Sequence, residues 1–515
     1  MQHSTNKGGV VAAGHQATAQ AAAHVLSEGG NAFDAAVAAM LAACVAEPIL
    51  ASAGGGGFLM AKPADSEPVI YDFFAQTPGQ KQALSAIDFY PITADFGTAS
   101  QTFHIGLGSS ATPGFVRGLF TIHHERCQLP LRALAESAIG LAKGGVSINS
   151  FQYLISRIVS PILQATPAAF SVNQSPSDAN SLIKESEIHR QPELADFLYA
   201  LSLEGEDLFY RGEVGRTLID DCIQHGGHLR WSDLHHYAVK KRIPLDYQYR
   251  DARIFSNPSP SLGGTLIAFA LSLLESESLH KLQPGSAEHL SKLAKAICLT
   301  QRVRNKTDSN LTQILKPEIR DQYANLQRSQ WICARGTTQI SIADRIGNLA
   351  SVTLSNGEGS GYVVPGTGIM MNNMLGEEDL NPRGFHQWPL NQRIASMMAP
   401  TLILRADGGI IVTGSGGSNR IRSAILQVIS NLVDFTMPLG EAIAHPRIHY
   451  EIDLLSLEPT VDQIVLKELE KSFPKQQVWH EKSLFFGGAH TVMVNSKGSI
   501  TGIGDSRRGG VSVTC

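Results

Sequence analysis

Hydrophobic and polar residues alternate most regularly in the stretch that follows Gly336. From Thr337 to Asp344 the chain reads Thr-Thr-Gln-Ile-Ser-Ile-Ala-Asp, which is typical of a half-buried β-strand. A turn over residues 344–348 and a second apolar run over 349–354 predict that this strand returns as a hairpin. Thr337 is therefore expected at the very start of a strand, directly after a flexible glycine.

The pattern elsewhere predicts two strand-rich blocks between helices. Residues 12–47 are expected to form two helices broken at Gly29-Gly30, with Asn31 capping the second helix, and the apolar run 35–46 is expected to be buried. We expect a surface loop at 171–180 and a weakening pattern over 307–335. The remaining predicted helices are 131–145, 186–225, 264–276 and 286–303, and the remaining predicted strands are 252–256, 402–404, 410–413, 490–494 and 499–502.

The position of Thr337 has a chemical consequence if the chain is cut before it. An N-terminal threonine carries its own general base, because its free α-amino group has a pKa of roughly 7.7 to 8.0 and can accept the hydroxyl proton. Taken alone, Gly-Thr-Thr is also an ordinary way to enter a strand. The motifs that follow it favour the first interpretation.

Ordered motifs along nearly the whole chain resemble the γ-glutamyltransferase family of self-cleaving N-terminal-nucleophile hydrolases. After Thr337 these motifs are Gly359-Ser360-Gly361, Pro365-Gly366-Thr367-Gly368, Asn372-Asn373, Ser396-Met397-Met398-Ala399-Pro400-Thr401 and Gly414-Ser415-Gly416-Gly417-Ser418. Before it they are Gly55-Gly56-Gly57-Phe58, Thr112-Pro113-Gly114, Phe209-Tyr210-Arg211-Gly212 and Asn257 to Gly264. The resemblance implies an α+β fold, the αββα four-layer sandwich, cut into a large subunit 1–336 and a small subunit 337–515.

The resemblance also implies the catalytic residues. Thr337 would be nucleophile and base, and the backbone N–H groups of Gly417 and Ser418 would stabilise the oxyanion. Ser355 matches a threonine that hydrogen-bonds the nucleophile and assists self-cleavage, with Thr353 as a rival for that place. Neither a cofactor nor a metal is expected.

The substrate-binding positions depart from the family pattern. Where the family has an arginine for the substrate carboxylate, this chain has Phe74, and no phenylalanine side chain can replace a bidentate guanidinium. The self-cleavage chemistry is therefore expected to be intact, while γ-glutamyl recognition is expected to be weakened. The other matched binding positions are Asn356, Met374, Glu377, Ser396 and Met397, of which Asn356 and Glu377 are equally well explained as turn and surface-loop residues.

Composition excludes several classes of function. A hydrophobic fraction of 43% and a charged fraction of 17% are typical of a globular protein, and the net charge of −4 offers no basic face for nucleic acid or an anionic membrane. Dinucleotide-binding, Walker and Gly-x-Ser-x-Gly motifs are missing, and Pro446 between His445 and His449 spoils a helical zinc pair. Six scattered cysteines and an N-terminus without a signal-like segment predict a cytoplasmic protein.

The sequence thus predicts a cytoplasmic self-cleaving amidase or acyltransferase that works through an acyl-threonine intermediate. Its expected partners are a small amide or γ-glutamyl substrate and the two subunits of one precursor. Two alternatives remain open: the same machinery acting on other acyl amides, as in acylases, or an uncleaved inactive homologue with a binding role.

Overall fold

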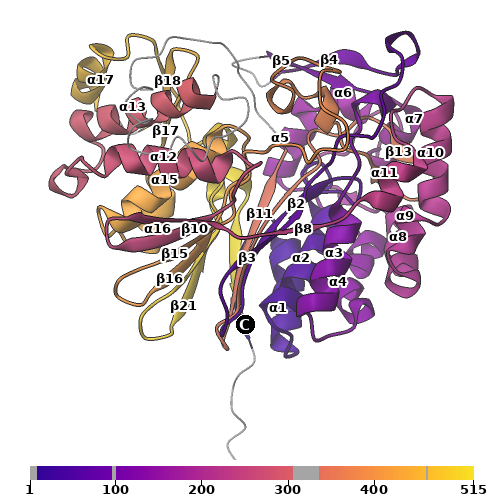
Figure 1. Cartoon of the computed structure of the whole chain (residues 1–515), viewed down its shortest axis with the longest axis horizontal. Helices are drawn as coiled ribbons and strands as arrows, with labels where there is room; N and C mark the ends of the chain where they lie inside the picture. The colour runs from indigo at the N-terminus through magenta and orange to yellow at the C-terminus, as the bar shows by residue number, and fades with distance from the viewer. Residues whose placement is uncertain (1–7, 96–99, 305–335, 460–461) are drawn as a thin grey trace, which may run out of the picture.

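The computed structural model describes residues 8–95, 100–304, 336–459 and 462–515. Two β-sheets face each other in the middle of the molecule, and helices cover the outer face of each sheet (Figure 1). The weak pattern predicted over 307–335 lies outside the described residues. The four layers confirm the predicted α+β sandwich.

The first sheet has seven strands, and segments from both sides of Gly336 are interleaved in it. The N-terminal strand β1 lies between β11 and the C-terminal strand β22, and β2 pairs with β12. In order across the sheet the strands are β22 (Val511–Thr514), β1 (Gly9–Ala13), β11 (Thr338–Asp344), β12 (Leu349–Ser355), β2 (Gly56–Lys62), β3 (Val69–Phe73) and β8 (Lys240–Arg242).

The second sheet has six strands and joins the first through polar contacts. Ser341 of β11 donates to the carbonyl of His490 at 2.8 Å, and Ser351 of β12 donates to the carbonyl of Thr413 at 2.9 Å. In order, its strands are β21 (Ile500–Ile503), β20 (Thr491–Val494), β16 (Ile410–Thr413), β15 (Thr401–Leu404), β10 (Ala252–Ser256) and β9 (Leu245–Tyr249).

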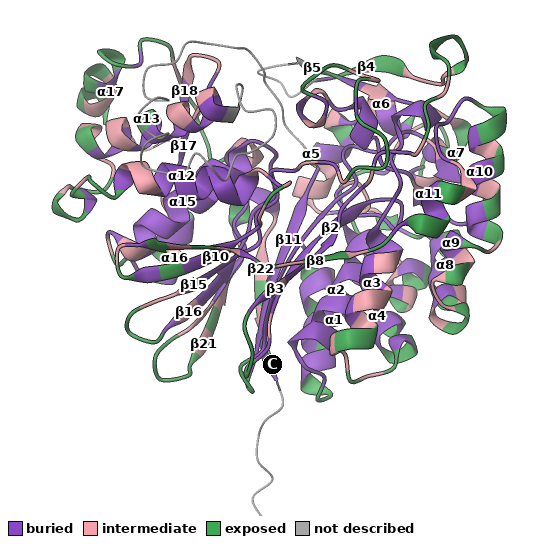
Figure 2. Cartoon of the chain, viewed as in Figure 1, coloured by how far each residue is buried: buried purple, intermediate pink, exposed green. Residues whose placement is uncertain are grey.

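Each helical layer buries an apolar face against its sheet (Figure 2). Helices near the first sheet are α1 (Gln16–Ser27), α2 (Ala32–Ala46), α3 (Phe115–Arg126), α4 (Leu131–Gly144) and α8 (Pro192–Glu204); those near the second are α12 (Gly263–Leu274), α13 (Ala287–Arg304) and α15 (Arg420–Val433). Every residue of α2 is buried, as its apolar run predicts, and Asn31 caps the helix as expected, in a capping box with Asp34. None of the helices in the described ranges is both long and apolar enough to cross a membrane.

Most of the other elements are short. The helices are α5 (Ser150–Ile158), α6 (Ser160–Leu163), α7 (Pro167–Val172), α9 (Asp207–Tyr210), α10 (Glu213–Gln224), α11 (Trp231–His236), α16 (Leu439–Ala444) and α17 (Gln463–Glu470). The strands are β4 (Tyr90–Asp95), β5 (Ser100–Ile105), β6 (Val146–Ser147), β7 (Ile188–His189), β13 (Val363–Val364), β14 (Ile369–Met370), β17 (Ile448–Glu451), β18 (Leu454–Leu457) and β19 (Gln476–Val478).

Two predicted elements were wrong in extent. Residues 12 and 13, assigned to a helix, belong to β1, because strands far away in the sequence pair with both of its edges. The helix predicted over 186–225 is instead β7 followed by three helices, α8, α9 and α10. Gly205 has a φ of +83°, a left-handed conformation that ends α8. The predicted strands and the loop at 171–180 otherwise agree with the structure to within a few residues.

Candidate functional site

The Gly336–Thr337 peptide bond is buried at the start of β11. The antiparallel register of β11 and β12 pairs Thr338 with Leu354, which brings Ser355 next to the junction. The Ser355 hydroxyl donates a hydrogen bond of 2.8 Å to the carbonyl oxygen of Gly336, and Thr337 is only 4% exposed. This carbonyl is the one that the Thr337 hydroxyl would attack in self-cleavage.

The rival hydroxyl, Thr353, lies elsewhere. It donates to the side-chain oxygen of Gln339 at 2.6 Å, and Gln339 in turn donates to Ser351 at 2.9 Å. Thr353 is therefore part of the polar layer between the sheets. Of the two candidates, Ser355 is the one that contacts the junction.

The turn after Ser355 holds the other polar group of Gly336. The Glu358 carboxylate accepts a hydrogen bond of 2.7 Å from the Gly336 N–H, and the Glu358 N–H donates to Asn373 at 2.9 Å. Gly357 has a φ of +64°, and a Cβ there would lie 2.1 Å from side-chain oxygens of both Asn373 and Glu377. Glu377, a predicted site residue, thus packs against the turn that holds Gly336.

The glycine run between β16 and α15 packs against Thr337 from the second sheet. A Cβ on Gly416 would lie 2.1 Å from the Thr337 carbonyl oxygen, so only glycine fits there. Ser418 has a φ of +55°, which is unusual for a residue with a side chain, and its hydroxyl donates to Asp379 at 3.3 Å. The predicted Gly417–Ser418 turn therefore adjoins the junction.

Arg508 reaches the same place from the C-terminal end of the chain. Its Nη1 atom donates to the Thr337 carbonyl oxygen at 3.4 Å, and the residue is 4% exposed. Burial lowers the pKa of Arg508 to about 10, against the opposing effect of the negative charge on Glu358.

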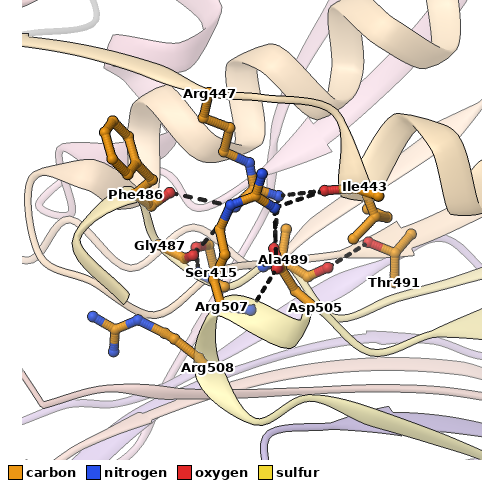
Figure 3. Close-up of polar contacts among 12 residues, drawn as sticks. Ser415, Ile443, Arg447, Phe486, Gly487, Ala489, Thr491, Asp505, Arg507 and Arg508 are labelled. Carbon is orange, nitrogen blue, oxygen red and sulfur yellow. Dashed lines mark hydrogen bonds and ion pairs between the residues drawn. The ribbon is translucent and has the colours of Figure 1, made fainter. Parts of the chain in front are cut away.

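A buried ionic cluster supports this end of the site (Figure 3). Arg447 and Asp505 form an ion pair of 2.7 Å, and Arg507 bridges Asp505 and Glu458 at 3.2 and 2.6 Å. Burial alone would raise the pKa of Asp505, but the two guanidinium groups lower it to about 2. Arg447 also donates to the Gly487 carbonyl at 3.2 Å.

The cluster connects to the glycine run through Ser415, whose hydroxyl oxygen accepts a 3.1 Å hydrogen bond from the N–H of Gly488. Gly416 and Gly488 also form an antiparallel β-bridge. The ionic cluster thereby supports the backbone of the glycine run that packs on Thr337.

The substrate positions that depart from the family are apolar and buried. Phe74, Met374 and Met397 are 1%, 1% and 6% exposed and belong to the same hydrophobic cluster. The Phe74 ring stacks on that of Phe58 with a centroid distance of 5.5 Å. These three side chains offer no charge to a carboxylate.

Arg393 is the cation nearest in sequence to Ser396, but its guanidinium is engaged elsewhere. It lies 3.3 Å from Asp72, donates to the carbonyl of Ala238 at 2.7 Å, and also contacts the carbonyl of Phe74 and the hydroxyl of Tyr237. With so many partners, Arg393 is poorly suited to replace the missing arginine.

The last two predicted binding residues are both buried. Asn356 donates to the Met370 carbonyl at 3.3 Å, and its Oδ1 atom accepts no hydrogen bond from the described part of the chain. The Ser396 hydroxyl oxygen accepts from the Met398 N–H at 3.1 Å, and the Ser396 carbonyl accepts from Leu262 at 2.7 Å. Ser396 therefore braces the segment that begins with Asn257.

Sequence reasoning did not identify Glu358, Asn373 or Arg508 as site residues. Glu358 could have been noticed as an acidic residue three positions after Ser355 in a glycine-rich turn. Arg508 gave no such signal, since it is 171 residues from Thr337. Among the described residues, no group of three or more His, Cys, Asp or Glu side chains is arranged to hold a metal ion.

Comparison with known proteins identifies the family of this chain. The family model described as gamma-glutamyltranspeptidase matches residues 18–515. The Acylase ACY 1 proenzyme of Pseudomonas sp. (strain SE83) is 29% identical over 98% of this chain and 93% of its own length. The Glutathione hydrolase proenzyme of Escherichia coli (strain K12) is 28% identical over 97% of this chain and 90% of its own.

Among solved structures, the cephalosporin acylase from Bacillus halodurans superposes with a TM-score of 0.85 at 22% identity, covering 98% of this chain and 96% of that one. This similarity supports the four-layer fold. The match of the family model to nearly the whole chain shows that this protein belongs to the γ-glutamyltranspeptidase family and is an enzyme of its transpeptidase and hydrolase type.

Proposed function

We propose that this enzyme cuts itself between Gly336 and Thr337 and then uses Thr337 to hydrolyse or transfer the acyl group of an amide. The observation that carries the proposal is the 2.8 Å hydrogen bond from Ser355 to the Gly336 carbonyl, next to a buried threonine. A hydroxyl donor there polarises the carbonyl and stabilises the charge that develops on its oxygen. The term proenzyme in the names of two relatives supports the same reaction.

Self-cleavage in this scheme proceeds through an ester. The Thr337 hydroxyl oxygen bonds to the Gly336 carbonyl carbon, the Gly336–Thr337 C–N bond breaks, and the nitrogen takes up the hydroxyl proton. Water then hydrolyses the ester and leaves a carboxylate on Gly336 and a free α-amino group on Thr337. The products would be a large subunit 1–336 and a small subunit 337–515, each of which contributes strands to both sheets.

The mature enzyme would repeat this chemistry on a substrate. The α-amino group takes the proton of the Thr337 hydroxyl, whose oxygen attacks the amide carbon, and the backbone N–H groups of Gly417 and Ser418 stabilise the oxyanion. The leaving amine takes the proton. Water or an amine acceptor then releases the acyl group from Thr337.

We propose further that the preferred acyl group lacks an α-carboxylate. The apolar cluster with Phe74, Met374 and Met397 favours an uncharged acyl chain, and Arg393 is already bound to Asp72. The acylase relative supports this choice. The second candidate, a γ-glutamyl amide, is favoured by the glutathione hydrolase relative and by the retained carboxylate of Glu377 beside the turn.

Two further proposals concern the location of the protein and the role of Asn356. We place the protein in the cytoplasm on the strength of its scattered cysteines, and the five in the described ranges are free thiols. We also propose that Asn356 contacts an amino group of the substrate through its buried Oδ1 atom.

Sequencing the fragments of the purified protein tests the proposed function. Two bands on a denaturing gel are expected, and the smaller should begin Thr-Thr-Gln-Ile-Ser. A single intact chain without amidase activity would support the inactive alternative. A fragment with another N-terminus would remove Thr337 as the nucleophile.

A further inference from the structure

Two opposite charges adjoin the Gly336–Thr337 junction. The Glu358 carboxylate accepts from the Gly336 N–H at 2.7 Å, and Arg508 donates to the Thr337 carbonyl at 3.4 Å. The two residues are 3% and 4% exposed, and the charge of Glu358 acts on Arg508. Because both are buried, salt and water screen them little, and their influence on a group between them is strong.

The backbone that carries each charge is held by further contacts. The backbone N–H of Glu358 is hydrogen-bonded to Asn373, and the Gly357 turn before it is packed against Glu377. Arg508 follows directly on Arg507 of the ionic cluster, and its side chain extends away from that cluster (Figure 3). The position of both charges is therefore well defined.

We propose that Glu358 is a positioning residue for the α-amino group that cleavage creates on Thr337, with Arg508 as its charge partner. This inference rests on the proposed self-cleavage. Before the cut, Glu358 holds the N–H of Gly336. After the cut, Gly336 is no longer joined to Thr337, and the new amine is one residue further along the chain from the N–H that Glu358 held. After cleavage the Glu358 carboxylate accepts a hydrogen bond from the new amine in place of the Gly336 N–H, and it orients that amine toward the Thr337 hydroxyl.

The two charges shift the pKa of the amine in opposite directions. A carboxylate stabilises the ammonium form of the amine and raises its pKa, while a guanidinium lowers it. Other groups also face this region: Glu377 beside Gly357, Asp379 through Ser418, Glu47 through Thr338, and His490 near Gly14. Burial raises the pKa of Glu47 and lowers that of His490 to about 4. These four residues are unchanged in Glu358→Gln and Arg508→Met, so a shift of the pH profile in either variant reports the altered charge.

The test is the pH dependence of kcat/KM for Glu358→Gln and Arg508→Met, measured on the cleaved full-length products with a simple acyl anilide. The activity of the free enzyme should rise as the amine loses its proton. Glu358→Gln should move this limb to lower pH by about one unit, and Arg508→Met should move it to higher pH by a similar amount. Glu185→Gln, at an exposed glutamate, is the control and should leave the limb unchanged.

The outcomes separate this inference from the proposed function. If the wild type is cut and active but neither variant moves the limb, the positioning role is wrong and the proposed function stands. If the wild type is not cut, the proposed function fails first. If Glu358→Gln is not cut, Arg508→Met still tests the charge pair, because the Arg508 side chain does not contact the Gly336 N–H. An unmoved limb in Arg508→Met would then overturn the charge pair.

Discussion

The junction at Thr337 is held by polar contacts, whereas the cluster around Phe74 is apolar. At the junction, Ser355 and Glu358 supply a hydrogen-bond partner to each polar backbone group of Gly336. At the cluster, Phe74 and Met374 are buried among apolar side chains and bring no charge. From this difference we infer that the geometry for bond cleavage and the recognition of substrate can vary separately within one family. We propose that this enzyme kept the first and rebuilt the second.

Removing the nucleophile should have the largest effect on the junction. Thr337→Ala should leave one full-length chain and abolish amidase activity, a loss on the order of a millionfold as for other catalytic nucleophiles. Thr337→Ser keeps a hydroxyl and should be cut slowly. Time-resolved intact-mass measurements follow both variants. Cleavage at the usual site in Thr337→Ala would rule out threonine as the attacking group.

The hydroxyl at Ser355 should matter next. Ser355→Ala removes the donor to the Gly336 carbonyl, so self-cleavage should slow by roughly 10² to 10³, as is usual for the loss of one oxyanion donor. Thr353→Val is the matched control, since its hydroxyl bonds Gln339 instead. It should cost about 1 kcal/mol of unfolding free energy and leave the cleavage rate nearly unchanged. The reverse ranking of the two cleavage rates would transfer the role to Thr353.

The glycine run should tolerate no added methyl group. A Cβ in Gly416→Ala would lie 2.1 Å from the Thr337 carbonyl oxygen, so the backbone must shift and activity should fall by about a hundredfold or more. Gly140→Ala is the control, because nothing lies within 4 Å of its added carbon on α4. That variant should be fully active and slightly more stable to heat. Equal activity of the two variants would show that this turn does not contribute to the site.

Local motifs were predicted best from the sequence, and Asn31 caps its helix because the motif is local. The prediction for Ser355 came from the family resemblance, and the register of β11 and β12 brings its side chain to the junction. Strand β1 was missed, since its identity depends on partners more than 300 residues away. Arg508 was missed for the same reason. Contacts made by distant segments leave no periodicity in the chain, so only the fold reveals them.

Substrate preference is expected to be the smallest effect, and it tests the comparison most directly. We would measure kcat/KM of the mature wild-type enzyme for γ-glutamyl and 4-aminobutyryl anilides side by side, because the second compound lacks only the α-carboxylate of the first. With no guanidinium to pair with it, the buried α-carboxylate should weaken transition-state binding of the γ-glutamyl compound, so the 4-aminobutyryl compound should be favoured by about ten- to a hundredfold. A strong preference for the γ-glutamyl compound would contradict the account, because it would mean that a cation such as Arg393 leaves Asp72 and binds the carboxylate.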